Sequence, residues 1–121
     1  LRLPHRSFGT VIHVGTRIGD NVTIFHGVTL GRADAYREPS RSDFRGIEVE
    51  DDVVIGAGAV VLCKRGVLTI GRGSIIGANA VLLNSTGPHE VWAGNPATLL
   101  RKHVPEPVAA PNRKQPPSAG A

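Results

Sequence analysis

Residues 12–31 read IHVGTRIGDNVTIFHGVTLG, and this stretch repeats a unit of six residues. Its large aliphatic side chains are spaced six positions apart, at Ile12, Ile18, Ile24 and Leu30. A period of six is neither the 3.6-residue period of a helix nor the two-residue alternation of a single strand. It is typical of a short strand followed by a corner, so that three units complete one triangular coil.

The same unit returns twice further along the chain. The later runs are Val49, Ile55, Val61 and then Ile70, Ile76, Leu82. One coil cannot bury its own apolar face, so stacked coils must form the core together. The chain has 15 glycines and only 4% aromatic residues, which suits a narrow interior with tight corners. The sequence therefore predicts an all-β fold, a single-stranded parallel β-helix over residues 1–90.

The repeat is interrupted at two places. After Leu30 the six-residue pattern is lost, and we expect a loop insertion over residues 32–46. After Val61 three extra residues predict a small bulge at residues 63–66. Loops on a rigid scaffold often carry functional residues, although a tolerated insertion is the alternative at both places. We expect residues 91–104 to pack back on the prism and to end in a short helix or an extended tail. Residues 105–121, rich in proline, are expected to be disordered.

The composition limits the classes of function. The single cysteine, Cys63, excludes an internal disulfide, and no apolar run approaches the ~20 residues of a membrane span. We see no signal peptide and expect a cytoplasmic protein. Residues 1–100 carry ten basic and nine acidic side chains, a balance that argues against nucleic-acid binding. Because the chain begins at Leu1 rather than Met, we expect it to be a fragment.

Four stretches form a recognisable set when they are taken in order. They are Leu3-Pro4-His5 with Gly9, Ile18–Ile24 running into Gly27–Gly31, Val54–Val60 with its echo Ile76–Val81, and Ala93–Ala97. Over residues 3–103 the sequence resembles the C-terminal half of serine acetyltransferases and of their relatives that acetylate sugars and polysaccharides. The resemblance implies a left-handed β-helix, a homotrimer and an O-acetyltransferase that uses acetyl-CoA as acyl donor and takes a small-molecule or sugar acceptor.

The resemblance also assigns roles to individual residues. His5 matches the family's catalytic base, and histidine suits that role because its pKa of ~6.5 lies near working pH. Arg45 and His26 match positions that face the acceptor. Small residues and cations match positions that contact acetyl-CoA: Gly31, Ala57, Ala78, Arg101 and Lys102. No metal site is predicted.

The chain departs from the family pattern near this site. The family's Asp-His pair reads Pro4-His5, and the coil whose carboxylate orients the base is missing. The family's Arg-His pair in the loop reads Arg45-Gly46, which puts serine in doubt and brings the chain closer to the sugar-modifying relatives. Two alternatives stay open: a non-enzymatic trimeric scaffold, and a metal-dependent carbonic anhydrase with the same hexapeptide fold.

Overall fold

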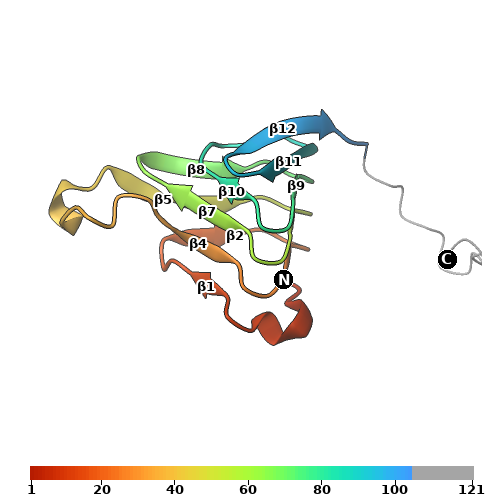
Figure 1. Ribbon diagram of the computed structural model, residues 1–121, viewed down its shortest axis with the longest axis horizontal. Helices are drawn as coiled ribbons and strands as arrows, with labels where there is room; N and C mark the ends of the chain where they lie inside the picture. The colour runs from red at the N-terminus through yellow and green to blue at the C-terminus, as the bar shows by residue number, and fades with distance from the viewer. Residues whose placement is uncertain (105–121) are drawn as a thin grey trace, which may run out of the picture.

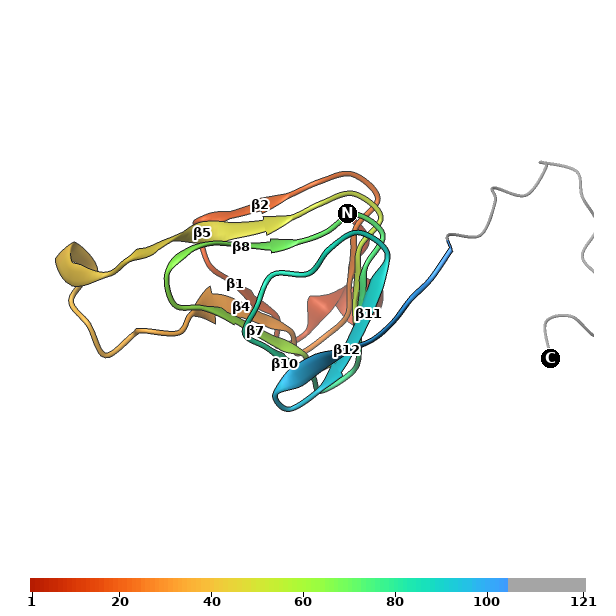
Figure 2. The same cartoon turned by 90° about the horizontal axis from the view of Figure 1, so that it is seen from above.

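The computed structural model describes residues 1–104; the tail expected to be disordered, residues 105–121, lies outside the described residues. Short strands follow the three sides of a triangular prism and stack into three sheets (Figures 1 and 2). Every neighbouring pair of strands is parallel except the last. The predicted all-β parallel β-helix is confirmed. Among residues 1–104, no helix has the length and apolar character needed to cross a bilayer.

The three sheets are defined by their strands. Sheet 1 holds β1 (Val11–Ile12), β4 (Thr29–Arg32), β7 (Val60–Cys63) and β10 (Val81–Leu82). Sheet 2 holds β2 (Thr16–Ile18), β5 (Phe44–Val49) and β8 (Gly66–Ile70). Sheet 3 holds β3 (Thr23–Ile24), β6 (Val54–Ile55), β9 (Ile75–Ile76), β11 (Glu90–Gly94) and β12 (Ala97–Lys102). Two short 3₁₀ turns, η1 (Pro4–Ser7) and η2 (Pro39–Arg41), lie outside the sheets.

Three corners join these sheets. The chain passes from sheet 3 to sheet 1 at residues 25–28, which we call the His26 corner. It passes from sheet 1 to sheet 2 at the loop corner, where residues 33–43 project from the prism (Figure 2). It returns from sheet 2 to sheet 3 at residues 50–53, the Asp51 corner.

The pairing register shows where the repeat is lengthened. In sheet 1, Val11 pairs with Thr29, eighteen residues on, as three hexads require. The next partner, Val60, lies thirteen residues further than that spacing, because the chain makes the projecting loop between β4 and β5. The last partner, Val81, lies three residues further than the spacing, because Lys64, Arg65 and Gly66 are inserted at the loop corner.

The six-residue aliphatic positions form the core. Those of sheets 1 and 3 in the upper coils are completely buried: Ile24, Leu30, Ile55, Val61, Ile76 and Leu82. Burying one such side chain contributes ~1.5–3 kcal/mol. Ile12, in the lowest coil, is 37% exposed because nothing among the described residues covers it from below. The side chains at the hexad positions therefore fill the interior of the prism.

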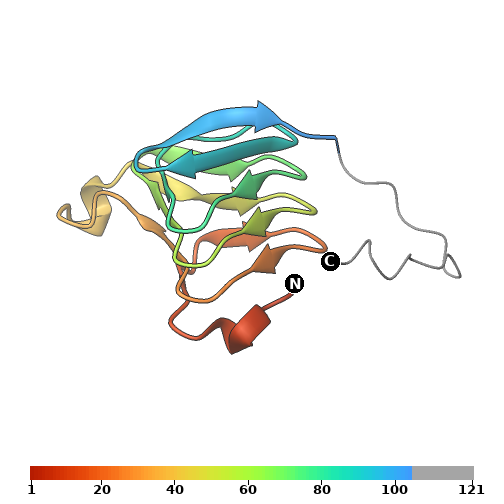
Figure 3. The same cartoon turned by 45° about the vertical axis from the view of Figure 1, so that its right-hand side comes forward.

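The upper end of the prism is closed by an antiparallel hairpin. β11 continues sheet 3, with Val91 paired to Ile75, and β12 then runs back along β11 (Figure 3). Among residues 1–104, sheet 2 has no strand above β8. Buried polar groups of Ser74, Thr86 and Glu90 bond to backbone and to one another there. Through residue 104 the C-terminal segment is extended rather than helical, which agrees with the extended form of the two expected.

Candidate functional site

The His26 corner carries a column of residues in successive coils. The amide of Gly58 donates to the carbonyl of His26 at 3.0 Å, and the amide of Asn79 donates to the carbonyl of Ala57 at 2.9 Å. These bonds place His26, Ala57 and Ala78 above one another at the same position of the turn. Three residues singled out from the sequence for acceptor or donor contacts thus share one edge of the prism.

The turns of this column are dictated by local sequence. Ala59 donates to the carbonyl of Gly56, and Ala80 donates to the carbonyl of Gly77, both at 3.2 Å. Each bond closes a four-residue turn whose third residue has positive φ, 71° at Gly58 and 57° at Asn79. A type II turn requires positive φ at that place, which explains why glycine and asparagine occur there.

Ala57 and Ala78 are the second residues of these turns. Within residues 1–104, neither amide donates a hydrogen bond. Ala57 is half-buried and Ala78 is exposed, and a methyl group covers little of the backbone behind it. Two unspent donors in adjacent coils, about 4.8 Å apart, fit the amide groups of an extended ligand such as a pantetheine arm.

His5 lies below this column on a strained turn. His5, Arg6 and Ser7 all have positive φ, between 53° and 57°, a conformation that costs non-glycine residues ~1–2 kcal/mol each. The turn brings the His5 ring edge-on to the His26 ring, with the ring centres 5.0 Å apart and the planes at 82°. Strained backbone of this kind clusters at functional sites. The structure therefore brings the predicted base and His26 together.

The surroundings of His5 and His26 are open and contain few partners. Both histidines are exposed. Within residues 1–104, no carboxylate is hydrogen-bonded or ion-paired to either ring. In the same part of the chain, no three His, Cys, Asp or Glu side chains gather as metal ligands. The Ser7 hydroxyl oxygen is buried without a hydrogen-bond partner there, an uncommon state for a buried polar atom.

Arg45 lies at the loop corner, not at the His26 corner. Its Nη1 donates to the carbonyls of Ser42 and Phe44, both at 3.1 Å, and it lines a shallow pocket on sheet 2 together with Arg17 and Glu48. Sheet 1 separates it from His5 within one chain. A single copy of the chain therefore does not bring the predicted base and the predicted acceptor-binding arginine together.

Gly46, which follows Arg45, is required by the backbone. Its φ is 149°, and a Cβ at this position would lie 2.8 Å from the carbonyl oxygen of Gly15 in the coil below. A histidine would be both strained and too close to that oxygen. The Arg45-Gly46 pair, noted in the sequence as a departure from the family pattern, thus has a structural cause.

The root of the projecting loop is held by a buried carboxylate that sequence reasoning missed. Asp34 is 1% exposed; its Oδ1 lies 2.9 Å from Arg32 Nε, and its Oδ2 accepts from the Ser42 hydroxyl at 2.9 Å. Arg32 also donates to the carbonyl of Arg37 at 2.8 Å. One acid thus ties both ends of the loop to β4. The only signal in the sequence was an acid following an arginine at the start of the insertion.

The other residues predicted to contact acetyl-CoA lie away from the column. Arg101 and Lys102 end β12 opposite Val91 and Glu90, whereas the turn of that hairpin lies at the His26 side of sheet 3. Gly31 lies in β4, not at a corner, and a Cβ there would meet nothing closer than 3.8 Å. Packing in the chain does not require glycine at position 31, so its effect is to keep the outer face of sheet 1 shallow.

Comparison with known proteins identifies the same architecture. Residues 40–63 match a family model described as the hexapeptide repeat of succinyl-transferase. The chain is 39% identical over 116 residues to a serine acetyltransferase of Mycobacterium tuberculosis, covering 93% of this chain and 46% of that protein. It is 42% identical over 94 residues to a serine acetyltransferase of Staphylococcus xylosus, covering 78% and 40%. The chain therefore spans less than half the length of these curated relatives.

Solved structures agree. Serine acetyltransferase from Brucella abortus in complex with coenzyme A superposes with a TM-score of 0.71 at 33% identity, over 84% of this chain and 37% of that one. Serine acetyltransferase of Neisseria gonorrhoeae in complex with serine gives 0.66 at 34% identity, over 80% and 36%. The expected left-handed winding is confirmed by these neighbours. By its fold, its repeat and its sequence, the chain is similar to the hexapeptide-repeat β-helix of serine acetyltransferases.

Proposed function

We propose that the chain is the acyl-transferring β-helix of an acetyl-CoA-dependent O-acetyltransferase. The observation that carries the proposal is the His26 corner, where the strained His5 turn lies against His26 and the backbone amides of Ala57 and Ala78, which donate no hydrogen bond within residues 1–104, lie in the two coils above. O-acetyl transfer needs a base beside the acceptor hydroxyl and a thioester carbonyl ~3–3.5 Å from it. The column supplies a base at its lower end and a docking edge for the donor above.

The chemistry assigned to His5 is general-base catalysis. The neutral imidazole takes the proton of the acceptor hydroxyl while the hydroxyl oxygen attacks the thioester carbon. When the carbon–sulfur bond then breaks, the imidazolium returns this proton to the sulfur of the leaving CoA. His26, stacked edge-on against His5, lies beside the reacting hydroxyl and limits how the His5 ring can turn. The exposed position of both rings leaves room for a small acceptor.

Serine is the acceptor we propose. Support comes from the relatives, which are named serine acetyltransferases, and from the similar structure of the Neisseria gonorrhoeae enzyme, which was solved in complex with serine. The sugar-type acceptor suggested by Arg45-Gly46 loses its main argument, because the backbone requires Gly46 irrespective of the acceptor. A sugar hydroxyl remains an outcome that an acceptor screen distinguishes.

A homotrimer completes the proposed site. Sheets 1 and 3 turn aliphatic side chains outward, among them Val60 and Ile75, whereas sheet 2 turns Arg17, Glu48 and Thr69 outward. Two apolar outer faces that meet at the His26 corner favour association through that corner. A neighbouring copy can then bring its Arg45 to the His5 of the first. Analytical ultracentrifugation should give three times the chain mass.

The test is acceptor-dependent release of CoA from acetyl-CoA. With serine present, the His5→Ala variant should lose about 10²–10⁴-fold in rate. The matched control is His13→Ala, because His13 lies at the loop corner and its ring accepts a hydrogen bond from the amide of Gly15. An unchanged rate in His5→Ala would remove His5 from the mechanism. No release with serine, simple sugars or polysaccharide fragments would favour the non-enzymatic scaffold.

A further inference from the structure

The charges of the chain are separated between two corners of the prism. At the loop corner, apart from the Arg32–Asp34 pair, five cations outnumber two acids, a balance of +3: Arg37, Arg41, Arg45, Lys64 and Arg65 against Glu38 and Asp43. The Asp51 corner and the turns directly below and above it hold four acids and one cation, a balance of −3: Asp20, Glu50, Asp51 and Asp52 against Arg72. All of these side chains are exposed. The near-neutral total therefore hides two opposite poles at the two ends of sheet 2.

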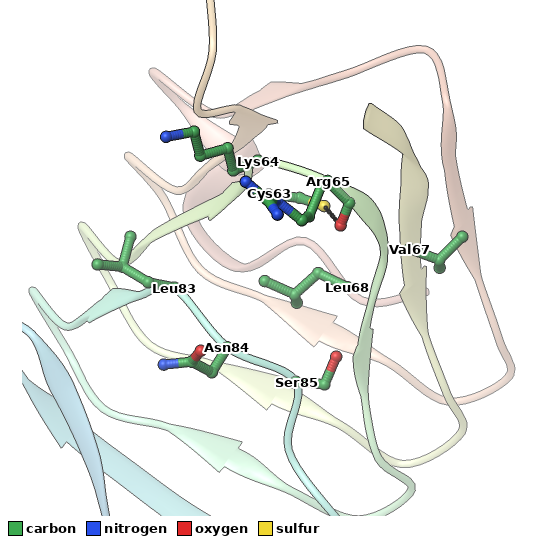
Figure 4. A pocket seen from close by; sticks show the side chains of 8 residues that line it. All are labelled: Cys63, Lys64, Arg65, Val67, Leu68, Leu83, Asn84 and Ser85. Carbon is green, nitrogen blue, oxygen red and sulfur yellow. Dashed lines mark hydrogen bonds between the residues drawn. The ribbon is translucent and has the colours of Figure 1, made fainter. Parts of the chain in front are cut away.

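The fold leaves the cations of the loop corner without firm partners. Within residues 1–104, Arg41, Lys64 and Arg65 take part in no ion pair. Arg37 lies 4.0 Å from Asp43 with both side chains exposed, a contact that contributes little to stability. The projecting loop carries its two arginines between β4 and β5, and Lys64 and Arg65 border a shallow groove one coil above (Figure 4).

The loop presents its arginines on a firm backbone. The buried Asp34 fixes the root of the loop. The carbonyl of Arg37 accepts a hydrogen bond from Arg32 at 2.8 Å, and the amide of Arg41 donates to the carbonyl of Glu38 at 2.9 Å. A loop that is ordered before it docks loses little conformational entropy on docking, so these charges are suited to pair with a fixed surface.

The acids of the opposite corner have no cation to neutralise them. The carboxylates of Asp51 and Asp52 accept hydrogen bonds from the turn below, both at 2.7 Å. That of Glu50 accepts from the amide of Arg72 at 2.9 Å, and within residues 1–104 that of Asp20 has no hydrogen bond. In the same part of the chain none of the four forms an ion pair. Like charges placed this close repel one another, and a cationic surface from outside relieves the repulsion.

We propose that in the homotrimer the projecting loop of each copy lies across sheet 3 of the next copy, where Arg37 and Arg41 pair with that copy's Asp20 and Glu50. The inference rests on the trimer of the proposed function. It adds the contact that selects the partner surface and brings Arg45 to the next copy's active site. Complementary charges guide association and fix the register between two surfaces. Arginine suits this role because its planar fork can bind both oxygens of a carboxylate.

Cyclic symmetry places the two poles at the same height. In a ring of three copies, one surface of each copy meets a different surface of the next. When the prisms stand side by side around the axis, rotation leaves each residue at its own height. The loop enters β5 and Glu50 directly follows β5, so both belong to the same coil, and Asp20 ends the coil below. The loop of one copy therefore meets the acids of the next without a shift along the prism.

The loop is long enough for this contact. Residues 33–43 leave the prism and return to it, so their tip reaches at most about 18 Å, half the extended length of that segment. One side of the prism holds six residues and spans at most about 20 Å. With Arg45 at the next copy's His26 corner, the tip comes close to its Asp51 corner. Tyr36 in this loop is 73% exposed, and Val54 and Ile75 on the outer face of sheet 3 give its ring an apolar surface to cover.

The experiment is an exchange of charges followed by sedimentation equilibrium. Reversing the loop charges in Arg37→Glu/Arg41→Glu should raise the protein concentration at which half of the copies dissociate at least about tenfold. Reversing the corner charges in Asp20→Lys/Glu50→Lys should have the same effect. The variant that combines all four substitutions restores opposite charges and should return to within about threefold of the wild type. Release of CoA with serine should fall and recover in the same order, because Arg45 arrives with the loop.

Controls separate this effect from misfolding and from net charge. Circular dichroism should show an unchanged fold, because the four side chains are exposed and the carboxylates that join neighbouring turns are kept. Arg101→Glu/Lys102→Glu reverses two charges at the end of β12 and should dissociate like the wild type. Raising NaCl from about 0.05 M to about 0.5 M should raise the dissociation concentration of the wild type about tenfold, and that of Arg37→Gln/Arg41→Gln much less.

The outcomes distinguish this contact from the rest of the proposed function. A loop variant that stays as associated as the wild type would overturn the inference and leave the proposed function intact. Loss of association that the combined variant does not recover would also overturn it, because the loop would then pair with another surface. A wild type that stays monomeric would refute the homotrimer together with the inference. A trimer that behaves as predicted but releases no CoA with any acceptor would refute the proposed catalysis alone.

Discussion

Replacing Ser74 by alanine should destabilise the upper end of the prism strongly for so small a change. Ser74 is completely buried at the end of the prism where, in the described part of the chain, sheet 2 has no further strand. Its hydroxyl donates to the carbonyl of Gly87 at 2.7 Å and accepts from the Thr86 hydroxyl at 3.1 Å and the Glu90 amide at 3.3 Å. One oxygen therefore serves two backbone groups, the Gly87 carbonyl and the Glu90 amide, and the Thr86 hydroxyl.

The magnitude follows from the groups left without partners. A buried polar group that loses its hydrogen bond costs ~1–3 kcal/mol. Gly87 is only half-buried, so water can replace the lost donor there, but Thr86 and Glu90 are buried. The space left by one hydroxyl oxygen is too small for a water molecule. Two orphaned groups, one of them held by a long bond, give an expected loss of about 2–4 kcal/mol in the free energy of unfolding.

Equilibrium unfolding in urea, followed by circular dichroism, measures this loss. The matched control is Ser40→Ala in η2, an exposed serine whose replacement should change the unfolding free energy by at most ~0.5 kcal/mol. If Ser74→Ala lies within that margin of the wild type, the polar network does not stabilise the upper end, and the reasoning given for it is wrong.

Three further predictions concern single groups. The Trp92 ring N–H and the Gly87 amide lower the pKa of Glu90, so its stabilisation is complete above about pH 4.5 and is lost as pH falls through the folded-state value. The difference in Tm between wild type and Glu90→Gln should therefore shrink on acidification below that pH; a constant difference would contradict it. Gly58→Ala should lower stability by ~1–2 kcal/mol or more, because φ is positive and the new Cβ would collide with the Asn79 side chain, whereas Asn79→Gly should be nearly neutral in the same thermal melt. Cys63 should react with a thiol reagent only after unfolding, and rapid labelling of the native protein would show that the insertion above it opens.

The periodic part of the molecule could be predicted from the sequence because the aliphatic residue of each hexad can be buried in only one way. An aliphatic side chain every six positions, such as Ile24, Ile55 or Ile76, can be buried only if the chain turns after each short strand. Residues needed for the turns, such as Gly58 and Asn79, follow from the same rule. The placement of His5 beside His26 was also within reach, because it depends on counting residues per coil.

The rest depends on contacts that have no period. Asp34 reaches a serine eight residues away, and Ser74 bonds to residues beyond the next strand; neither partner can be found by counting. The position of Arg45 across sheet 1 from His5 follows from which corner carries the loop, and the six-residue period does not determine that corner. The end of β12 was ambiguous because Arg101 and Lys102 suit either a helix or a strand.

The central claim is that acetyl-CoA lies along the His26 corner and accepts hydrogen bonds from the amides of Ala57 and Ala78, which have no acceptor within residues 1–104. Proline at position 57 removes one of these donors, and proline is favoured at the second position of such a turn, so the fold should be retained. Calorimetric titration should show CoA affinity falling at least tenfold in Ala57→Pro, with Tm unchanged within a few degrees and with Ala57→Ser, which keeps the amide, binding like the wild type. A folded Ala57→Pro protein that binds CoA as tightly as the wild type would contradict the claim.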